Sequence, residues 1–268
     1  VVVSSLKKIE VIVPTYRSRD LTRSFVRSFE YFKPDDMEVT FHLVENSADV
    51  SYKDESTTWA NDVRWYNNSD ADTNENAANN RGSWANCSAI DFVKHDIKSE
   101  FVFLCHNDCI VTSRLFFEEL RSKVLEGCKL VGTLRSPARN NYLHSSGLLV
   151  ETELFKEVGV TPEFHRDVDV CEILTVHCVE NEIPYFAFDS TFSSRELFES
   201  CNEPWKSLGP SCGVDRTLDS NHTEVIYAHL GRGSEKNFKQ YFKQGKVLYD
   251  DWNSLCEDLL KKEDNESK

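Results

Sequence analysis

Positive charge is scarce in this sequence. Its 31 lysines and arginines face 45 aspartates and glutamates, which gives a formal net charge of -14 over 268 residues. Proteins whose main task is to bind a phosphate backbone or an anionic membrane need clustered lysine and arginine. We therefore expect no nucleic-acid partner, and we attribute the acidity to solubility.

Long apolar runs are also absent. No stretch approaches the roughly 20 apolar residues that cross a bilayer. The amino end, VVVSSLKKIEVIV, is too short and too interrupted for a signal peptide. With 40% hydrophobic and 28% charged residues, the composition is that of a globular chain. We expect a soluble, cytoplasmic protein without an integral membrane segment.

The cysteines lack the spacing of a metal or redox motif. There are nine of them, an odd number, and no CxxC pair. Most lie within apolar or helical patterns, namely Cys87, Cys105, Cys109, Cys128, Cys171 and Cys178. This placement predicts small buried side chains in a reducing compartment.

Strand and helix patterns alternate along the first half of the chain. Strands are predicted at residues 8–16, 38–47, 62–69 and 101–104, and helices at 20–32 and 84–93. Pro14 is expected to break the first strand, and Asp20 to cap the first helix. The alternation predicts an α/β fold in which helices cover both faces of a mostly parallel sheet.

The second half is less regular. Helices are predicted at 113–126 and 166–183, strands at 129–134 and 184–189, and a strand leading into a short helix at 145–160. A loop-rich stretch at 190–222 is a candidate lid or acceptor loop, in which Trp205 is either a sugar platform or a core residue. The tail at 237–262 is amphipathic, which favours packing on the body or self-association into a homo-oligomer.

Polar residues follow the predicted strands at the ends where they leave the sheet. Thr15 to Arg17 follow the first strand, Glu45 and Asn46 end the second, a loop with Asn79, Asn80 and Arg81 precedes a helix, and His106 to Asp108 follow the fourth. In open α/β sheets, ligands bind outside the carboxyl ends of the strands. We expect these segments to meet at one edge.

Asp108 is the first candidate for chemistry. A carboxylate flanked by His106 and Asn107 offers oxygen and imidazole ligands, which suit Mg²⁺ or Mn²⁺ bridging a diphosphate. An Asp that caps the following turn is an equally good interpretation of this tripeptide. Spacing alone does not decide between them.

Several fragments, in order and approximate spacing, carry a family resemblance. They are VIVPTYRSRDL, LVENSAD, NENAANNRGSWANCSAI, EFVFLCHNDCIV, HSSGLLVETELFKEVGV, RDVDVCEIL and YAHLGRGS. Together they span residues 9–234 and resemble the GT-A glycosyltransferases, most closely glycosyltransferase family 2 with its rhamnosyltransferase-like members. The resemblance implies a Rossmann-like GT-A domain at 1–234, with a nucleotide-binding half at about 1–112, an acceptor half at about 113–234, and a helical extension at 235–268.

The resemblance also implies a function and a set of residues. The function is metal-assisted, usually inverting transfer of a sugar from a nucleotide-sugar donor, UDP- or dTDP-linked, to a glycan or glycoconjugate acceptor. The residues that would bind the nucleotide-sugar are Pro14, Thr15, Tyr16, Arg17, Glu45, Asn79, Arg81, Gly82, Trp84, His106, Asn107 and Arg232. His106 to Asp108 fall on the family's DxD motif, with His106 in place of the first Asp. Asp108 and His229 would then hold Mn²⁺ or Mg²⁺.

An inverting transfer needs a base for the acceptor hydroxyl. The segment RDVDV resembles the family's EDxD segment, which makes Asp167 the first candidate base and Asp169 the second, with Arg166 replacing an acidic residue. Taken without the resemblance, both are carboxylates favoured by a helix amino terminus. The remaining histidines have no evident pairing and are expected to be structural: His42, His95, His144, His165, His177 and His222.

Two other functions compete with a glycosyltransferase. A nucleotidyltransferase of related fold would be expected to carry a glycine-rich loop after the first strand, and VPTYRSRD has no glycine. A domain that keeps the fold, has lost catalysis and binds a nucleotide-sugar or glycan is the main alternative. His106 and Arg166 favour it, whereas Asp108, Asp167 and His229 favour the enzyme.

Overall fold

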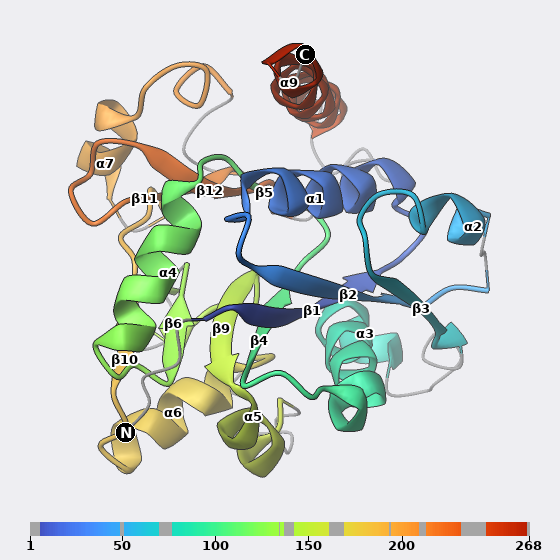
Figure 1. Cartoon of the computed structure of the whole chain (residues 1–268), viewed down its shortest axis with the longest axis vertical. Helices are drawn as coiled ribbons and strands as arrows, with labels where there is room; N and C mark the ends of the chain where they lie inside the picture. The colour runs from blue at the N-terminus through green and yellow to red at the C-terminus, as the bar shows by residue number, and fades with distance from the viewer. Residues whose placement is uncertain are drawn as a thin grey trace.

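The computed structural model describes residues 6–48, 51–69, 77–133, 135–136, 142–160, 169–192, 194–208, 213–231 and 245–266. Within these ranges, the mixed α/β architecture expected from the sequence is present (Figure 1). None of the helices found there combines the length and the apolar character needed to cross a bilayer.

A seven-stranded sheet forms the centre, in the order β10-β6-β9-β4-β1-β2-β3. Its strands are β1 (Lys8–Thr15), β2 (Glu38–Glu45), β3 (Val63–Asn67), β4 (Phe101–Cys105), β6 (Leu130–Gly132), β9 (Gly147–Glu151) and β10 (Tyr185–Ala187). Only β9 runs antiparallel to its two neighbours in this sheet, and all other pairings are parallel. The expected mostly parallel sheet is therefore confirmed.

The first strand continues through Pro14 rather than breaking there. Pro14 pairs with Val44 in the parallel register of β1 and β2, and β1 ends one residue later. On its other side, β1 pairs with β4 only as far as Ile12. Because successive residues of a strand direct their N–H groups to opposite sides, Pro14 faces the side where the pairing has ended and no N–H is needed.

Helices cover both faces of this sheet (Figure 1). One face packs against α1 (Arg19–Phe32) and α4 (Leu115–Leu125), and the other against α3 (Ala77–Val93), α5 (Thr152–Val158) and α6 (Glu172–Glu180). Phe29 is central to the first face, with its ring 4.9 Å from that of Phe117 and 5.5 Å from that of Phe103. Because both faces are covered, β1 and β2 are buried at every position after the first, including their polar residues.

Two helix starts differ from the prediction. Ser18, not Asp20, occupies the N-cap of α1, and Asp20 lies in the first turn. The sixth helix begins at Glu172, because Cys171 has a left-handed backbone (φ 65°) that interrupts the helical path before it. The shorter elements are α2 (Lys53–Ser56), the 3₁₀ turn η2 (Lys94–Asp96), α7 (Arg195–Ser200) and the strand pair β7 (Arg135–Ser136) and β8 (Tyr142–Leu143).

A second, antiparallel sheet has the strand order β11-β12-β5. It comprises β11 (Asp215–Leu218), β12 (Val225–His229) and β5 (Cys109–Val111). The first of these strands lies inside the stretch expected to be loop, as does α7, so that expectation was too simple. Trp205 is buried against Trp252, with ring centroids 6.5 Å apart, and is a core residue rather than a sugar platform.

The carboxyl-terminal helix α9 (Gly245–Glu266) packs against α1. Its apolar side buries Tyr249, Trp252, Cys256 and Leu260, and Arg23 of α1 is paired with Glu257 at 2.8 Å. Packing on the body, one of the two expected roles of the tail, is what the structure shows. Self-association stays a prediction.

The cysteines behave largely as expected. Of the six singled out from the sequence, only Cys128 is half-buried and the others are buried; none of the cysteines in the described part of the chain forms a disulfide. Cys105 and Cys109 flank the turn after β4, and their thiols donate to the carbonyl oxygens of Ile12 and Ser146. Burial raises the pKa of both thiols, so they are packing residues.

Candidate functional site

The turn that joins β4 to β5 carries the first part of the site. The chain leaves the central sheet at Cys105 and enters the second sheet at Cys109, which pairs with His229 at the end of β12. The N–H of Leu230 donates to the carbonyl oxygen of Asp108 at 2.8 Å. The junction of the two sheets therefore fixes Asp108 and brings His229 beside it.

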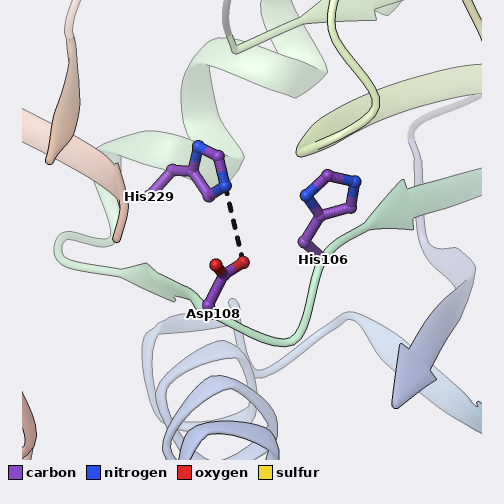
Figure 2. A group of neighbouring side chains, drawn as sticks. All are labelled: His106, Asp108 and His229. Atoms are coloured by element: carbon purple, nitrogen blue, oxygen red, sulfur yellow. Dashed lines mark ion pairs between the residues drawn. The ribbon is translucent and has the colours of Figure 1, made fainter. Parts of the chain in front are cut away.

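His106, Asp108 and His229 form a cluster that could hold a metal ion (Figure 2). One ligand atom from each lies within 4.8 Å of those of the other two. Nε2 of His229 is 3.4 Å from Oδ1 of Asp108, and these two side chains are only 9% and 7% exposed. Two imidazoles and one carboxylate, two of them from the turn after β4 and one from the end of β12, are a donor set that suits a divalent transition metal.

Asp215 lies behind His229 and was missed in the sequence. It is opposite His229 in the antiparallel pairing of β11 and β12, and its Oδ2 is 3.3 Å from Nδ1 of His229. Burial by itself would lower the pKa of His229, but the charge of Asp108 and the hydrogen bonds to Asp108 and Asp215 outweigh it and raise the pKa to about 9. Because strand β11 was expected to be loop, nothing in the sequence indicated this pairing.

His106 is held by polar side chains from two separate parts of the chain. Its Nε2 lies 2.9 Å from Oγ of Ser145 and 3.3 Å from Nδ2 of Asn86 on α3. Burial lowers the pKa of His106 to about 4, although the nearby charge of Asp108 acts in the opposite direction. The ring is therefore neutral near pH 7, which is the form that binds a metal.

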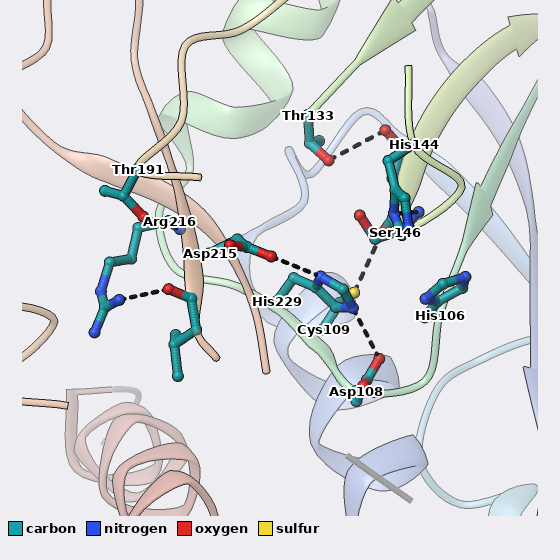
Figure 3. Close-up of polar contacts among 12 residues, drawn as sticks. His106, Asp108, Cys109, Thr133, His144, Ser146, Thr191, Asp215, Arg216 and His229 are labelled. Atoms are coloured by element: carbon teal, nitrogen blue, oxygen red, sulfur yellow. Dashed lines mark hydrogen bonds and ion pairs between the residues drawn. The ribbon is translucent and has the colours of Figure 1, made fainter. Parts of the chain in front are cut away.

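His144 was expected to be structural and instead lies beside this cluster. Its ring centroid is 5.4 Å from that of His106 and 5.7 Å from that of His229 (Figure 3). It lies in the turn between β8 and β9, and β9 pairs with β4 in antiparallel orientation. The signal that could have found it is its position at the start of HSSGLLVETELFKEVGV, one of the fragments that carry the family resemblance.

The loop after β1 is supported by Glu45 at the end of β2. Glu45 is fully buried and accepts hydrogen bonds from the hydroxyls of Thr15 and Tyr52, both at 2.6 Å, and from the backbone N–H groups of Arg17 and Ser47. Burial, followed by the charge of Glu45, raises the pKa of the Tyr52 hydroxyl, so that it remains a proton donor in this network. Arg17 itself has a left-handed backbone (φ 50°) and is exposed.

The other candidate nucleotide residues are less closely gathered. Pro14 is a buried strand residue; Tyr16 is half-buried, with the Arg17 guanidinium 5.4 Å from its ring centre. Asn107 points to α1, where its amide donates to Thr22 at 3.3 Å. Trp84 lies half-buried on α3. Asn79, Arg81 and Gly82 lie within the first turns of this helix rather than in a loop, because α3 begins at Ala77.

Of the two candidate bases, Asp169 lies in the described part of the chain and Asp167 does not. Arg232 also lies outside the described residues. Asp169 is half-buried in the turn before α6; its N–H donates to Glu172 at 2.8 Å, and its own carboxylate accepts from the N–H of Val170 at 2.8 Å. Its negative charge acts to raise the pKa of His106, against the larger effect of burial.

No family model and no curated protein matches the sequence. Among solved structures, the glycosyltransferase GlyE of Streptococcus pneumoniae is similar over 98% of this chain and 64% of its own, with a TM-score of 0.53 and 10% identity. The fold is that of the GT-A glycosyltransferases. This confirms the fold that the sequence fragments implied.

Two other solved structures are similar over about two thirds of this chain. The mannosyltransferase PcManGT of Pyrobaculum calidifontis, solved with GDP-Man and Mn²⁺, matches 67% of this chain and 54% of its own, at 15% identity and a TM-score of 0.49. Glucosyl-3-phosphoglycerate synthase of Mycobacterium tuberculosis, solved with Mn²⁺, UDP and glucosyl-3-phosphoglycerate, matches 68% and 70%, at 15% identity and a TM-score of 0.47. The chain thus spans about half of the mannosyltransferase and less than two thirds of GlyE.

Proposed function

We propose that this chain is a glycosyltransferase that moves a sugar from a UDP- or dTDP-linked donor to a hydroxyl of a glycan or glycoconjugate acceptor, with inversion. One observation carries the proposal: His106, Asp108 and His229 converge where β4 of a GT-A sheet ends. In such sheets this edge is where ligands bind. The proposal includes membership of glycosyltransferase family 2, which the ordered sequence fragments support.

The donor set fits Mn²⁺ or Mg²⁺, and we propose Mn²⁺ first. Imidazole ligands suit Mn²⁺ better than Mg²⁺, which prefers an all-oxygen octahedron. The hydrogen bond between Nδ1 of His229 and Asp215 directs Nε2 toward the cluster, where a cation would displace the proton that the raised pKa of His229 keeps on the ring near pH 7. When bound, the cation would neutralise the charge that develops on the leaving diphosphate.

His106 occupies the position of the first Asp in the family's DxD motif, and this replacement is compatible with the proposed metal site. Its ring contributes a ligand atom to the cluster, and Ser145 and Asn86 fix its orientation from the other side. The replacement thus exchanges one kind of ligand for another rather than removing it. The presence of His106 therefore does not imply that the domain has lost catalysis.

The donor nucleotide is proposed to lie along the loop after β1. The Glu45 carboxylate holds that loop by accepting hydrogen bonds from the Thr15 hydroxyl and the Arg17 N–H. The Arg17 side chain is exposed. An exposed guanidinium beside a tyrosine ring suits a phosphate or a base. Trp84 on α3 would border the same pocket.

The transfer itself needs one proton acceptor. The acceptor oxygen attacks the anomeric carbon as its proton passes to a carboxylate, and the bond from that carbon to the diphosphate oxygen breaks with its electron pair leaving on the nucleoside diphosphate. We propose Asp167 as that carboxylate, with Asp169 as the second candidate. The electrostatic effect of Asp169 on His106 supports a carboxylate base within reach of the cluster's charge.

We also propose the division of the chain implied by the resemblance, with the GT-A domain at residues 1–234 and the extension at 235–268. The nucleotide-binding half, to about residue 112, ends just after β5 and so includes the turn that carries Asp108, and the acceptor half supplies His144, Asp215 and His229. A site built from both halves suits an enzyme that brings a donor and an acceptor together.

The proposal is tested by hydrolysis of nucleotide-sugars. The full chain is incubated with UDP-, dTDP- and GDP-linked hexoses, with Mn²⁺ or with a chelator, and release of the nucleoside diphosphate is followed. We expect release from one nucleotide class, dependent on Mn²⁺ and lost in Asp108→Asn. Asp258→Asn, an exposed site on α9, is the matched control. Nucleotide binding without turnover would instead support the non-catalytic binding module.

A further inference from the structure

The inference concerns His144, which the resemblance gave no role. The rings of His106, His144 and His229 lie pairwise 5.4, 5.5 and 5.7 Å apart between centroids, so that three imidazoles surround one small volume. Figure 3 shows His144 above the other two, with its ring directed toward the space between them. It reaches this position from the acceptor half, on the turn that precedes β9.

The hydrogen bond of His144 defines which nitrogen carries its proton. The backbone N–H of Ser146 donates to Nδ1 of His144 at 3.2 Å. Because a backbone N–H can only donate, Nδ1 must accept, and the ring proton is therefore on Nε2. This hydrogen bond within the turn thus makes Nε2 of His144 an N–H donor.

This arrangement is the reverse of the one at His229. There Nδ1 faces the carboxylate of Asp215, which is the partner that a metal-binding histidine keeps on its second nitrogen. A histidine whose Nδ1 accepts a hydrogen bond has its proton on Nε2 and offers no lone pair there to a cation. His144 is therefore suited to bind an anionic oxygen, and not to act as a fourth metal ligand.

We propose that His144 is a binding residue for the donor's diphosphate, to which its Nε2–H donates a hydrogen bond beside the cluster of His106, Asp108 and His229. The inference rests on the proposed function, because that function supplies the diphosphate. A neutral N–H donor suits this place, since it adds affinity for the phosphate oxygens without competing for the cation.

The test separates metal binding from phosphate binding. Titration of the full chain with Mn²⁺, followed by electron paramagnetic resonance, gives the affinity for the metal alone. Calorimetric titration with inorganic pyrophosphate at saturating Mn²⁺ then gives the affinity for the diphosphate, without any contribution from base or sugar. We expect His144→Ala to leave the Mn²⁺ affinity within about twofold and to weaken pyrophosphate binding about tenfold or more.

Two conservative variants distinguish binding from support of the turn. The amide oxygen of Asn takes the place of Nδ1 and can accept from Ser146, whereas the amide N–H of Gln takes the place of the Nε2–H. We therefore expect His144→Asn to bind pyrophosphate as weakly as His144→Ala, and His144→Gln to recover part of the affinity. His95→Ala, an exposed histidine on η2, is the control and should match the wild type.

Three results would overturn the inference. They are full recovery by His144→Asn, a loss of Mn²⁺ affinity in His144→Ala, and absence of Mn²⁺-dependent pyrophosphate binding by the wild type. Failure of the proposed function is seen separately: if pyrophosphate binds and depends on His144, but no nucleotide-sugar is turned over, the inference stands and the transferase does not.

Discussion

His229 and Asp215 face each other across the antiparallel pair of β11 and β12, with Nδ1 of the histidine 3.3 Å from Oδ2 of the carboxylate. On its other side, His229 meets Asp108. Figure 3 shows the imidazole ring between these two carboxylates, one on the second sheet and the other on the turn after β4. The pairing of β11 with β12 thus sets the direction of a proposed metal ligand.

Asp215→Asn should lower the affinity of the chain for Mn²⁺ by about tenfold or more, because the amide no longer holds the ring in its metal-binding tautomer. Calorimetric titration with Mn²⁺ measures the change. Asp189→Asn is the matched control, since Asp189 also contacts a histidine, His222, at 2.8 Å but at the exposed surface. Equal Mn²⁺ affinities in the Asp215→Asn variant and the wild type would remove His229 from the metal site.

The acid sensitivity of the fold should depend on Glu10. Burial by itself would raise the pKa of Glu10, but hydrogen bonds from His42 and from the N–H groups of Ser99 and Lys98 lower it to about 2. Because the folded pKa is below the unfolded value of about 4.5, this carboxylate stabilises the fold fully above pH 4.5 and progressively less as the pH falls toward 2. The contribution is on the order of 3 kcal/mol.

Urea unfolding of the wild type and Glu10→Gln between pH 2 and 6 measures this contribution. The wild type should lose stability more steeply below pH 4.5 than the variant, and the two curves should approach each other at the acid end. Glu153→Gln, at an exposed position of α5, should retain the wild-type slope. Parallel curves for the Glu10→Gln variant and the wild type would show that its network does not persist in solution.

Phe29→Ala should destabilise the fold by about 3–5 kcal/mol, the usual cost of removing a fully buried aromatic side chain. Phe29 is completely buried and contacts the rings of Phe103 and Phe117. Tyr31, two residues later on the same helix, is 41% exposed and supplies the control. Thermal unfolding should therefore separate Phe29→Ala from Tyr31→Ala by several degrees; similar midpoints would contradict the placement of this core.

Gly147→Ala should displace the turn that carries His144. A Cβ at Gly147 would lie 2.3 Å from Oγ1 and 2.9 Å from Cγ2 of Thr133, which is closer than such atoms approach. We expect a loss of about 1–3 kcal/mol in the free energy of unfolding. Thr133→Ala in the same chain removes both atoms, and the double variant should recover much of the loss in a denaturant titration. No recovery would mean that another contact makes glycine necessary.

The sequence allowed the central architecture to be predicted, because it depends on local patterns. The buried runs of β1, β2 and β4 and the amphipathic helix α1 carry their own periodicity, and strand ends such as Glu45 and Asp108 follow from the strand positions. Asp215 and His144 could not be found in this way. Both reach the cluster through antiparallel pairings with partners many residues away, which no short-range pattern records.

Glu45 illustrates a different limit. Its position at the end of β2 was predicted, but its hydrogen bonds to Thr15 and Tyr52 arise only when the loop after β1 and the turn before α2 fold together. The start of α3 at Ala77 was similarly hidden, because a polar segment rich in asparagine predicts loop by composition. For Glu45, tertiary contacts decided the outcome.

The central claim is that His106, Asp108 and His229 hold a divalent cation that binds a donor diphosphate. The most direct measurement is calorimetric titration of the full chain with UDP, dTDP and GDP, each with and without Mn²⁺, repeated on Asp108→Ala. We predict binding of one nucleotide that requires Mn²⁺ and is lost in the variant. Binding of none of the three, or binding that is indifferent to both Mn²⁺ and Asp108, would contradict the claim.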